Sequence, residues 1–425
     1  MKARCFLLAL TLVVPTVVAA AGPPEPGGIG AGIRYKPGEI LVRLKSGCSE
    51  TDRAAVRAEM NGSLIRRFGR IGVEHIRLVE EAVEATIHQF SNHPLIEFVE
   101  PDYAMYAAAV LDDAMWSSLF HLRGVDGTVY AMAIYNGELV VAGDFTGVFD
   151  LPVNCIARWN GSAWAPLGDG ASSWIYALAV HDGALYAGGL FGSAGGVPAS
   201  HIARWDGTAW SPVGSGVNSI VYALASTSGG LVAGGNFTFA GGNPANHVAI
   251  WDGSAWSPLG SGITGGAQTV RALATWNGDI YVGGSFTTAG GVPAARIARW
   301  DGAAWSALGT GLSGIVYSFA VYGGALVAAG TLTSAGGSPV NRVAQWDGAA
   351  WSALGAGITG GSFPQVFSLA SWNSDLYASG VFTAADGIPV NYAARWNGTA
   401  WSPVGGGLSS AGARALVPFG STLIA

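Results

Sequence analysis

Histidine and cysteine side chains would carry the most informative chemistry in this 425-residue chain, because both bind metals and both act in catalysis. The chain has seven histidines and three cysteines, and their spacing matches no metal-binding motif. The chain consists largely of a repeated unit, described below. At one equivalent position, its six successive copies carry Cys155, His201, His247, Arg296, Arg342 and Tyr392. Neighbouring sheets pack about 10 Å apart and diverge outward, so these side chains would not converge. We therefore predict no metal site and no cofactor.

Aspartates are the next candidates, since one follows a tryptophan in most repeats, as in Trp205-Asp206-Gly207. Calcium takes roughly six to eight oxygen ligands, and one carboxylate per turn without neighbouring oxygen ligands does not supply them. Asp-Gly is also a preferred dipeptide of tight hairpin turns. We interpret these aspartates as turn residues.

A nine-residue phrase recurs six times, first as Ile-Ala-Arg-Trp-Asn-Gly-Ser-Ala-Trp in residues 156–164 and next as Ile-Ala-Arg-Trp-Asp-Gly-Thr-Ala-Trp in residues 202–210. Its first tryptophans stand at positions 159, 205, 251, 300, 346 and 396, so the period is 46 to 50 residues. A near-constant period of this size indicates a repeat architecture. Residues that all repeats share are explained by the folding of the unit, so only departures from the pattern point to a site.

Each repeat is predicted to form a four-stranded antiparallel meander. In the second repeat, an apolar run over 175–180 leads through Asp182-Gly183 into a strand over 184–191 that contains a glycine doublet. Glycines inside a strand indicate that another backbone or a large ring packs closely against them. Strands over 201–205 and 209–213, joined by a second Asp-Gly turn, complete the unit.

Such sheets can bury two apolar faces by packing around a common axis, so we predict a mainly β fold, a β-propeller. The glycine doublet followed by spaced aromatic residues, as in residues 205–210, resembles the kelch-type blade. The repeat sequence is also similar to that of bacterial secreted propellers and fungal polarity-marker propellers. The resemblance covers residues 116–425 and implies a fold, because propellers host many unrelated activities.

The end of the chain resembles the beginning of a repeat. Residues 414–425 align with residues 271–282, and residues 115–119 resemble a fourth strand. We therefore expect six complete four-stranded blades plus a partial seventh in a propeller over residues 110–425. Because natural propellers avoid open sheet edges, we also expect the chain to be incomplete at its C-terminus.

The N-terminus has the pattern of a secretory signal peptide. Lys2 and Arg4 precede an apolar core over 6–18 and a run of small residues, with cleavage expected near Ala21. Residues 1–21 would be the signal and residues 22–33 a Pro/Gly linker. The apolar core is short for a span of about 20 residues. We expect a secreted or cell-surface protein with no membrane span after signal removal.

Residues 34–109 form a separate predicted domain. Residues 34–103 hold 10 of the 21 basic and 11 of the 27 acidic residues, whereas residues 116–425 contain nine arginines and no lysine. The expected order of elements is βαββαβ, a small α+β ferredoxin-like motif. Its strands are expected at 39–45, 63–68, 73–79 and 96–103, and its helices at 49–60 and 80–93.

Residues 37–45, Pro-Gly-Glu-Ile-Leu-Val-Arg-Leu-Lys, and residues 93–103, ending in Val-Glu-Pro-Asp-Tyr, resemble the fervidolysin-like subtilisin propeptide. The resemblance implies a domain that chaperones and inhibits its protease through the tail after the last strand. That tail would contact the protease through Tyr103, Ala104, Met105 and Tyr106. No protease domain follows, since the segments His-Gly-Thr-His, Gly-Thr-Ser-Met-Ala and Gly-x-Ser-x-Gly do not occur in the sequence. We therefore expect no catalytic residues. Three interpretations of the domain stay open: it acts on a protease in trans, it is a leftover folding or secretion module, or it is an unrelated small α+β domain.

A ligand of the propeller is expected on the face that carries the second-to-third connections and the links between blades. These segments are longer and more variable than the tight turns of the other face. The candidate binding residues there are Asn154, His201, Asn246, His247, Arg296, Asn341, Arg342, Asn391 and Tyr392.

We predict a non-enzymatic propeller that presents a protein- or glycan-binding face behind a propeptide-like domain. The alternative is an inhibitor or chaperone of a subtilisin-type serine protease, acting in trans through residues 34–109. A nucleic-acid partner is not expected, because the propeller has no basic run. The formal net charge of −6 also becomes about −8 once the signal removes Lys2 and Arg4.

Overall fold

The computed structural model describes residues 39–45, 47–68, 73–78, 83–91, 93–101, 125–149, 151–408 and 412–425. The chain divides into two compact units, residues 1–111 and residues 112–425, and each is described by itself. The predicted signal peptide, the Pro/Gly linker and the predicted tail Tyr103 to Tyr106 lie outside the described residues.

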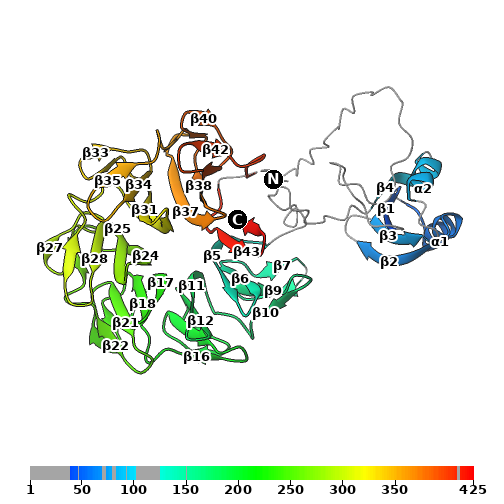
Figure 1. The fold of residues 1–425 in the computed structure, drawn as a ribbon. Helices are drawn as coiled ribbons and strands as arrows, with labels where there is room; N and C mark the ends of the chain where they lie inside the picture. Colours follow the sequence, from blue (N-terminus) through cyan, green and yellow to red (C-terminus); the bar gives the residue numbers. More distant parts are fainter. Residues whose placement is uncertain are drawn as a thin grey trace, which may run out of the picture. The chain divides into compact units, whose positions relative to one another are not determined.

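The N-terminal unit is an antiparallel sheet with two helices. Its elements follow the predicted order of strands and helices, and Ile40, Val42 and Ile76 of the sheet pack with Val56 and Phe90 of the helices. The strands lie in the order β2-β3-β1-β4 (Figure 1). The elements are β1 (Glu39–Leu44), α1 (Glu50–Glu59), β2 (Gly62–Phe68), β3 (Val73–Leu78), α2 (Val83–Phe90) and β4 (Ile96–Pro101).

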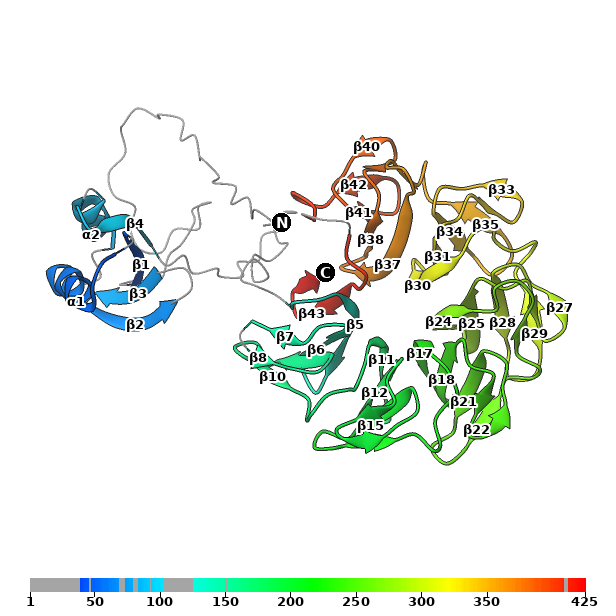
Figure 2. The same cartoon turned by 180° about the vertical axis from the view of Figure 1, so that it is seen from behind.

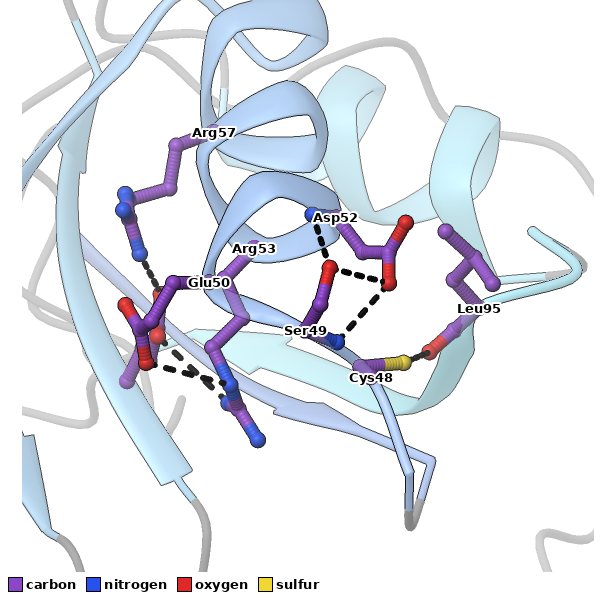
Figure 3. Close-up of polar contacts among 8 residues, drawn as sticks. Cys48, Ser49, Glu50, Asp52, Arg53, Arg57 and Leu95 are labelled. Carbon is purple, nitrogen blue, oxygen red and sulfur yellow. Dashed lines mark hydrogen bonds and ion pairs between the residues drawn. The ribbon is translucent and has the colours of Figure 1, made fainter.

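Helix α1 is fixed at its start and along its length. The Ser49 hydroxyl accepts a hydrogen bond from the Asp52 N–H at 3.2 Å, and the Asp52 carboxylate accepts one from the Ser49 N–H at 2.8 Å (Figure 3). Arg53 and Arg57 reach from α1 to Glu74 of β3, with N···O distances of 3.5 and 2.5 Å. Glu74 is fully buried, so these two guanidinium groups compensate a carboxylate that water cannot reach.

The C-terminal unit contains, among its described residues, six four-stranded antiparallel sheets with their strands in sequential order. The first strands are β5 (Val129–Tyr135), β11 (Ile175–His181), β17 (Val221–Thr227), β24 (Val270–Trp276), β30 (Val316–Tyr322) and β37 (Gln365–Trp372). The second strands are β6 (Glu138–Gly143), β12 (Ala184–Gly189), β18 (Gly230–Gly235), β25 (Asp279–Gly284), β31 (Ala325–Gly330) and β38 (Asp375–Val381). The third strands are β9 (Ile156–Trp159), β15 (Ile202–Trp205), β21 (Val248–Trp251), β28 (Ile297–Trp300), β34 (Val343–Trp346) and β41 (Ala393–Trp396). The fourth strands are β10 (Trp164–Pro166), β16 (Trp210–Pro212), β22 (Trp256–Pro258), β29 (Trp305–Ala307), β35 (Trp351–Ala353) and β42 (Trp401–Pro403).

The second-to-third connections carry short hairpins rather than open loops. These hairpins are β7 (Gly147–Val148) with β8 (Leu151–Pro152), β13 (Ser193–Ala194) with β14 (Val197–Pro198), β19 (Phe239–Ala240) with β20 (Asn243–Pro244), β26 (Thr288–Ala289) with β27 (Val292–Pro293), β32 (Ser334–Ala335) with β33 (Ser338–Pro339), and β39 (Ala384–Ala385) with β40 (Ile388–Pro389). Two links between sheets add a third strand to the fourth and sixth of these hairpins, namely β23 (Ile263–Thr264) and β36 (Ile358–Thr359).

The first strands of successive sheets lie side by side around a common centre, and the fourth strands lie outside (Figures 1 and 2). A last hairpin, β43 (Val417–Phe419) with β44 (Thr422–Ile424), lies between β37 and β5. Leu423 packs with Tyr377 of the sixth sheet, and Ile424 packs with Leu139 of the first. The hairpin supplies the two strands that the sequence predicts after the sixth repeat, whereas the predicted strand at 115–119 lies outside the described residues.

The paired tryptophans join neighbouring sheets. The two ring centroids of a pair lie 5.3 to 5.6 Å apart. In five sheets the second indole also donates a hydrogen bond of 2.8 to 3.0 Å to a backbone carbonyl of the preceding sheet. The repeated phrase is therefore explained by sheet-to-sheet packing. These donors and acceptors are Trp210 to Leu167, Trp256 to Val213, Trp305 to Leu259, Trp351 to Leu308, and Trp401 to Leu354.

The repeated aspartates are turn residues, as predicted. The Asp206 carboxylate accepts hydrogen bonds from the N–H groups of Thr208 and Ala209, at 2.8 and 2.9 Å. The part of the chain that the structure describes has no group of three or more His, Cys, Asp or Glu that could hold a metal ion. The same turn contacts are made by Asp252, Asp301, Asp347, Asn160 and Asn397.

Acid is expected to weaken the aspartate turns. Hydrogen bonds, chiefly from the Ala209 N–H, lower the pKa of Asp206 to about 2, and the pKa values of Asp252, Asp301 and Asp347 are lowered in the same way. Each folded-state pKa lies below the unfolded value of about 3.9, so the stabilisation is present above about pH 4 and is lost as the pH falls toward 2. Asparagine, which two sheets use naturally, makes the same contacts without titrating. The urea midpoint of the parent chain should therefore fall relative to that of a variant with these four aspartates replaced by Asn, as the pH is lowered from about 4 to 2. A constant difference between them would contradict this account.

Candidate binding face

One residue of each first strand stands outside the pairing register with the second strand. In β11, Ile175 pairs with Gly189 and Ala177 with Gly188, so Tyr176 between them has no partner. A β-bulge of this kind redirects a side chain away from the regular alternation of the strand. The residues at this bulge are Tyr130, Tyr176, Tyr222, Arg271, Tyr317 and Phe367.

The glycine doublets make room for the bulge. A Cβ on Gly189 would lie 2.1 Å from the Trp174 carbonyl oxygen, and one on Gly284 would lie 1.9 Å from the Thr269 carbonyl oxygen. The first strand thus approaches the second more closely than a side chain allows. The prediction that another backbone packs against these glycines is confirmed.

Replacing Gly284 by Ala is expected to destabilise the C-terminal unit by about 1–3 kcal/mol, because the new methyl group overlaps a backbone carbonyl that cannot move away freely. The urea midpoint, followed by tryptophan fluorescence, measures the change. Gly192→Ala is the matched control, since a Cβ there meets nothing within 4 Å. Equal midpoints for the two variants would contradict the close approach.

The bulge residues and Arg414 form a closed circle of side chains, which we call the channel ring. Going round it, the rings of Tyr130 and Tyr176 lie 5.0 Å apart, Tyr176 and Tyr222 lie 5.1 Å apart, and Tyr317 and Phe367 lie 6.0 Å apart. Arg271 fills the gap between Tyr222 and Tyr317, and Arg414 fills the gap between Phe367 and Tyr130. The circle therefore brings together residues from all six sheets and from the segment before β43.

The two arginines of the channel ring are each held between two aromatic rings. The guanidinium carbon of Arg271 lies 4.8 Å from the Tyr222 centroid and 5.9 Å from the Tyr317 centroid. That of Arg414 lies 4.6 Å from Phe367 and 5.6 Å from Tyr130. All four distances suit cation–π contacts. Within the described residues neither guanidinium has an ion-pair or hydrogen-bond partner, and Arg271 Nε is shielded from water.

Tyr130 and Tyr176 of the channel ring keep their protons at neutral pH. Burial raises the pKa of Tyr176 to about 12 and also raises the pKa of Tyr130. The Tyr130 hydroxyl donates a hydrogen bond of 3.0 Å to Asp144, which also accepts one from the Thr128 N–H. The ring therefore presents phenol and guanidinium donors, and Asp144 is already occupied by two of the chain's own donors.

The channel ring lies on the face that the sequence predicts for ligand binding. Ile175, next to Tyr176, pairs with the last residue of β12, after which the second-to-third connection begins. Of the ten large apolar side chains that are well exposed among the described residues of this unit, eight lie on these connections or on the links between sheets. Phe363 is the most exposed, at 79%. The eight are Phe149, Trp174, Leu190, Val197, Phe239, Val292, Phe363 and Ile388.

The predicted asparagines brace the connections of this face. The amide of Asn154 donates to the carbonyl oxygen of Asp169 at 2.9 Å, fifteen residues later. Asn246, Asn341 and Asn391 make the equivalent bond at 2.7 to 3.0 Å. These amides are thus engaged in contacts within their own repeats.

The other predicted residues share an unusual backbone conformation. His201, His247, Arg296, Arg342 and Tyr392 have φ angles between +60° and +68°. Burial lowers the pKa of His201 and of His247, which favours neutral rings. Arg342 donates to the backbone carbonyl oxygens of Pro364 and Leu332. Within the described residues, His201 Nδ1 and His247 Nδ1 are buried and have no hydrogen-bond partner.

Sequence reasoning missed the channel ring, although a signal was present. The bulge position of the first strand is Tyr in four repeats, Phe in one and Arg at Arg271, and the equivalent residue before β43 is Arg414. These two changes are departures from the repeat, the kind of residue that points to a site.

A separate groove of about 560 Å³ lies between the fifth and sixth sheets, near the first-to-second turns. Tyr322, Ser371, Asp375 and Trp396 line it. The Asp375 carboxylate accepts a hydrogen bond of 2.7 Å from Arg395 Nε, so its charge is already paired.

Two families of known domains match this chain. Residues 28–102 match the fervidolysin N-terminal prodomain, and residues 277–300 match a β-propeller described as a domain of unknown function, DUF5122. No curated protein matches. The chain is thus a β-propeller preceded by a propeptide-like domain. Its described residues contain no helix long and apolar enough to cross a membrane.

Solved structures resemble the chain distantly. A GH74 enzyme of Niastella koreensis is 16% identical with a TM-score of 0.42, over 66% of this chain and 45% of that one. The protein YjhT is 12% identical with a TM-score of 0.38, over 64% of this chain and 96% of that one. An acylaminoacyl peptidase of Pyrococcus horikoshii is 14% identical with a TM-score of 0.33, over 60% of this chain and 44% of that one. This chain therefore spans less than half the length of the GH74 enzyme that it matches.

Proposed function

We infer that this protein is a secreted or cell-surface, non-enzymatic propeller that binds a partner on the face around the channel ring. The observation that carries the proposal is the channel ring itself, seven side chains in contact around the common centre of the first strands. Exposed apolar residues surround it on the same face. Clustered aromatic residues and arginine are typical of binding hot spots, and clustered exposed apolar residues mark interaction surfaces.

A secreted location is supported by the signal-like N-terminus and by the fervidolysin-type domain that follows it. The blades are kelch-like in their glycine doublets and paired aromatic residues. The partner is a protein or a glycan. The predicted residues His201, His247, Arg296, Arg342 and Tyr392 would shape the outer part of the face through their connections.

The proposal is tested on peptide and glycan arrays with the full chain. A Trp174→Ser, Phe363→Ser variant should lose binding by roughly tenfold or more, as expected for interface hot spots. Val321→Ser is the matched control, because Val321 is 42% exposed but lies in a first strand away from the connections. Binding that the control weakens as much as the double variant would place the partner elsewhere.

The second candidate function is protease inhibition, favoured by the match of residues 28–102 to the fervidolysin prodomain. The proposed contacts are Tyr103, Ala104, Met105 and Tyr106. The full chain and the fragment 34–109 would be assayed against a panel of subtilisin-type proteases. No inhibition at micromolar concentrations of either would exclude this function. That result would not contradict the proposed binding face of the propeller.

A further inference from the structure

We propose that the channel ring recognises carboxylate groups of an acidic peptide segment through Arg271 and Arg414. The inference rests on the proposed function and names the chemistry of the partner. It starts from the two positions where the repeat exchanges an aromatic ring for a cation.

The stacking of each arginine determines which part of it can bind a ligand. The guanidinium carbon of each arginine lies over two aromatic rings, Tyr222 and Tyr317 for Arg271 and Phe367 and Tyr130 for Arg414. The edge of a guanidinium carries its N–H donors, and this edge binds carboxylates in a bidentate manner. The contacts with two rings restrict the position of each guanidinium group, and an anion would bind at its N–H edge.

No described residue neutralises these two charges. Arg158, Arg299 and Arg395 of the third strands pair with Glu138, Asp279 and Asp375 at 2.6 to 3.1 Å. Arg271 and Arg414 have no such partner among the described residues, and Arg271 Nε is a buried donor without an acceptor there. A carboxylate cannot reach an atom that is shielded from water, so an anionic ligand would bind the terminal guanidinium nitrogens rather than Nε.

The two arginines also suit a ligand with more than one carboxylate. Around the channel ring, Tyr317 and Phe367 separate them on one side, and Tyr130, Tyr176 and Tyr222 separate them on the other. They thus lie on nearly opposite sides of the channel ring. An extended segment that crosses the channel ring can offer one carboxylate to each arginine.

The surroundings favour a peptide over an acidic polysaccharide. Trp174 stands against Tyr176 with a centroid distance of 6.2 Å and is 43% exposed, and Phe363 and Phe239 are also exposed on this face. Apolar side chains next to the acidic residues of a peptide could bury these rings. A uronate chain carries carboxylates without comparable apolar groups.

The test measures fluorescence anisotropy of fluorescein-labelled decaglutamate titrated with the full chain at low salt. Arg271→Gln and Arg414→Gln should each weaken binding by about tenfold or more, the loss expected for a charge-assisted hydrogen bond. Arg204→Gln, which removes the same charge from β15, should change the affinity by less than about twofold. Arg271→Lys keeps the charge but has no bidentate edge, so its affinity should lie between those of the parent and of Arg271→Gln, whereas a purely structural role would give Lys no advantage over Gln.

Several outcomes would overturn the inference. Decaglutamate that does not bind, or that binds the Arg271→Gln, Arg414→Gln double variant as tightly as the parent, would remove the anion site. Stronger binding of polygalacturonate than of decaglutamate would assign the face to an acidic glycan instead. An array ligand that still binds the double variant but not the Trp174→Ser, Phe363→Ser variant would leave the proposed function standing without this inference.

Discussion

Replacing Glu74 by Ala is expected to destabilise the N-terminal unit by about 3–5 kcal/mol, the cost of removing one partner from a buried ion-pair cluster. The variant leaves Arg53 and Arg57 facing a buried gap beneath α1, with only 17% of each arginine side chain exposed. Because unfolding free energies of small domains are about 5–15 kcal/mol, most of this unit's stability would be lost. Hydrogen exchange across residues 50–59 in increasing urea measures the loss.

Glu97→Ala is the matched control in the same sheet. Glu97 pairs with Arg43 at 3.3 Å, but its side chain is half exposed, so its loss should cost at most about 1 kcal/mol. A similar shift in exchange for Glu74→Ala and Glu97→Ala would show that burial of Glu74 does not determine the stability of the unit.

The second large effect is expected for Trp401→Ala in the sixth sheet. Trp401 is almost fully buried, its ring lies 5.6 Å from that of Trp396, and its indole nitrogen donates to the Leu354 carbonyl oxygen at 2.9 Å. Truncating a buried tryptophan lowers the free energy of unfolding by about 3–5 kcal/mol. Here it would also remove packing and a hydrogen bond between the fifth and sixth sheets. Urea unfolding followed by tryptophan fluorescence gives the change.

Trp401→Phe separates packing from hydrogen bonding. Phenylalanine keeps much of the ring but leaves the Leu354 carbonyl oxygen without its donor, so we expect a loss of about 1–3 kcal/mol. If the Phe variant were as unstable as the Ala variant, the hydrogen bond rather than the packing would hold the two sheets together.

The fold was accessible from sequence because its determinants are local. The apolar runs of the first strands and the Asp-Gly and Asn-Gly turns lie within one repeat, and the turn residues Asp182 and Gly183 have the positive φ angles that such turns require. The same holds for the βαββαβ order, where Ser49 and Asp52 mark the start of α1. Repetition then made each local signal visible six times.

The candidate site was only partly accessible. The face was predicted from the length of its connections, but the channel ring depends on contacts between neighbouring sheets, such as Tyr176 with Tyr222, which lie a whole repeat apart. The bulge also moves these residues out of the regular alternation, so a period of two does not indicate where they point. Asn154 was predicted as a binding residue from its place on these connections, and a sequence does not reveal that its amide donates to the Asp169 carbonyl oxygen.

The most direct test of the central claim is a hydrogen-exchange footprint of the full chain with and without its best array ligand or decaglutamate. We predict protection in the segments around Tyr130, Tyr176, Arg271 and Arg414 and in the link that contains Phe363, with no change in the first-to-second turns. Protection confined to the turns and the groove around Tyr322 and Asp375 would contradict the assignment of the binding face.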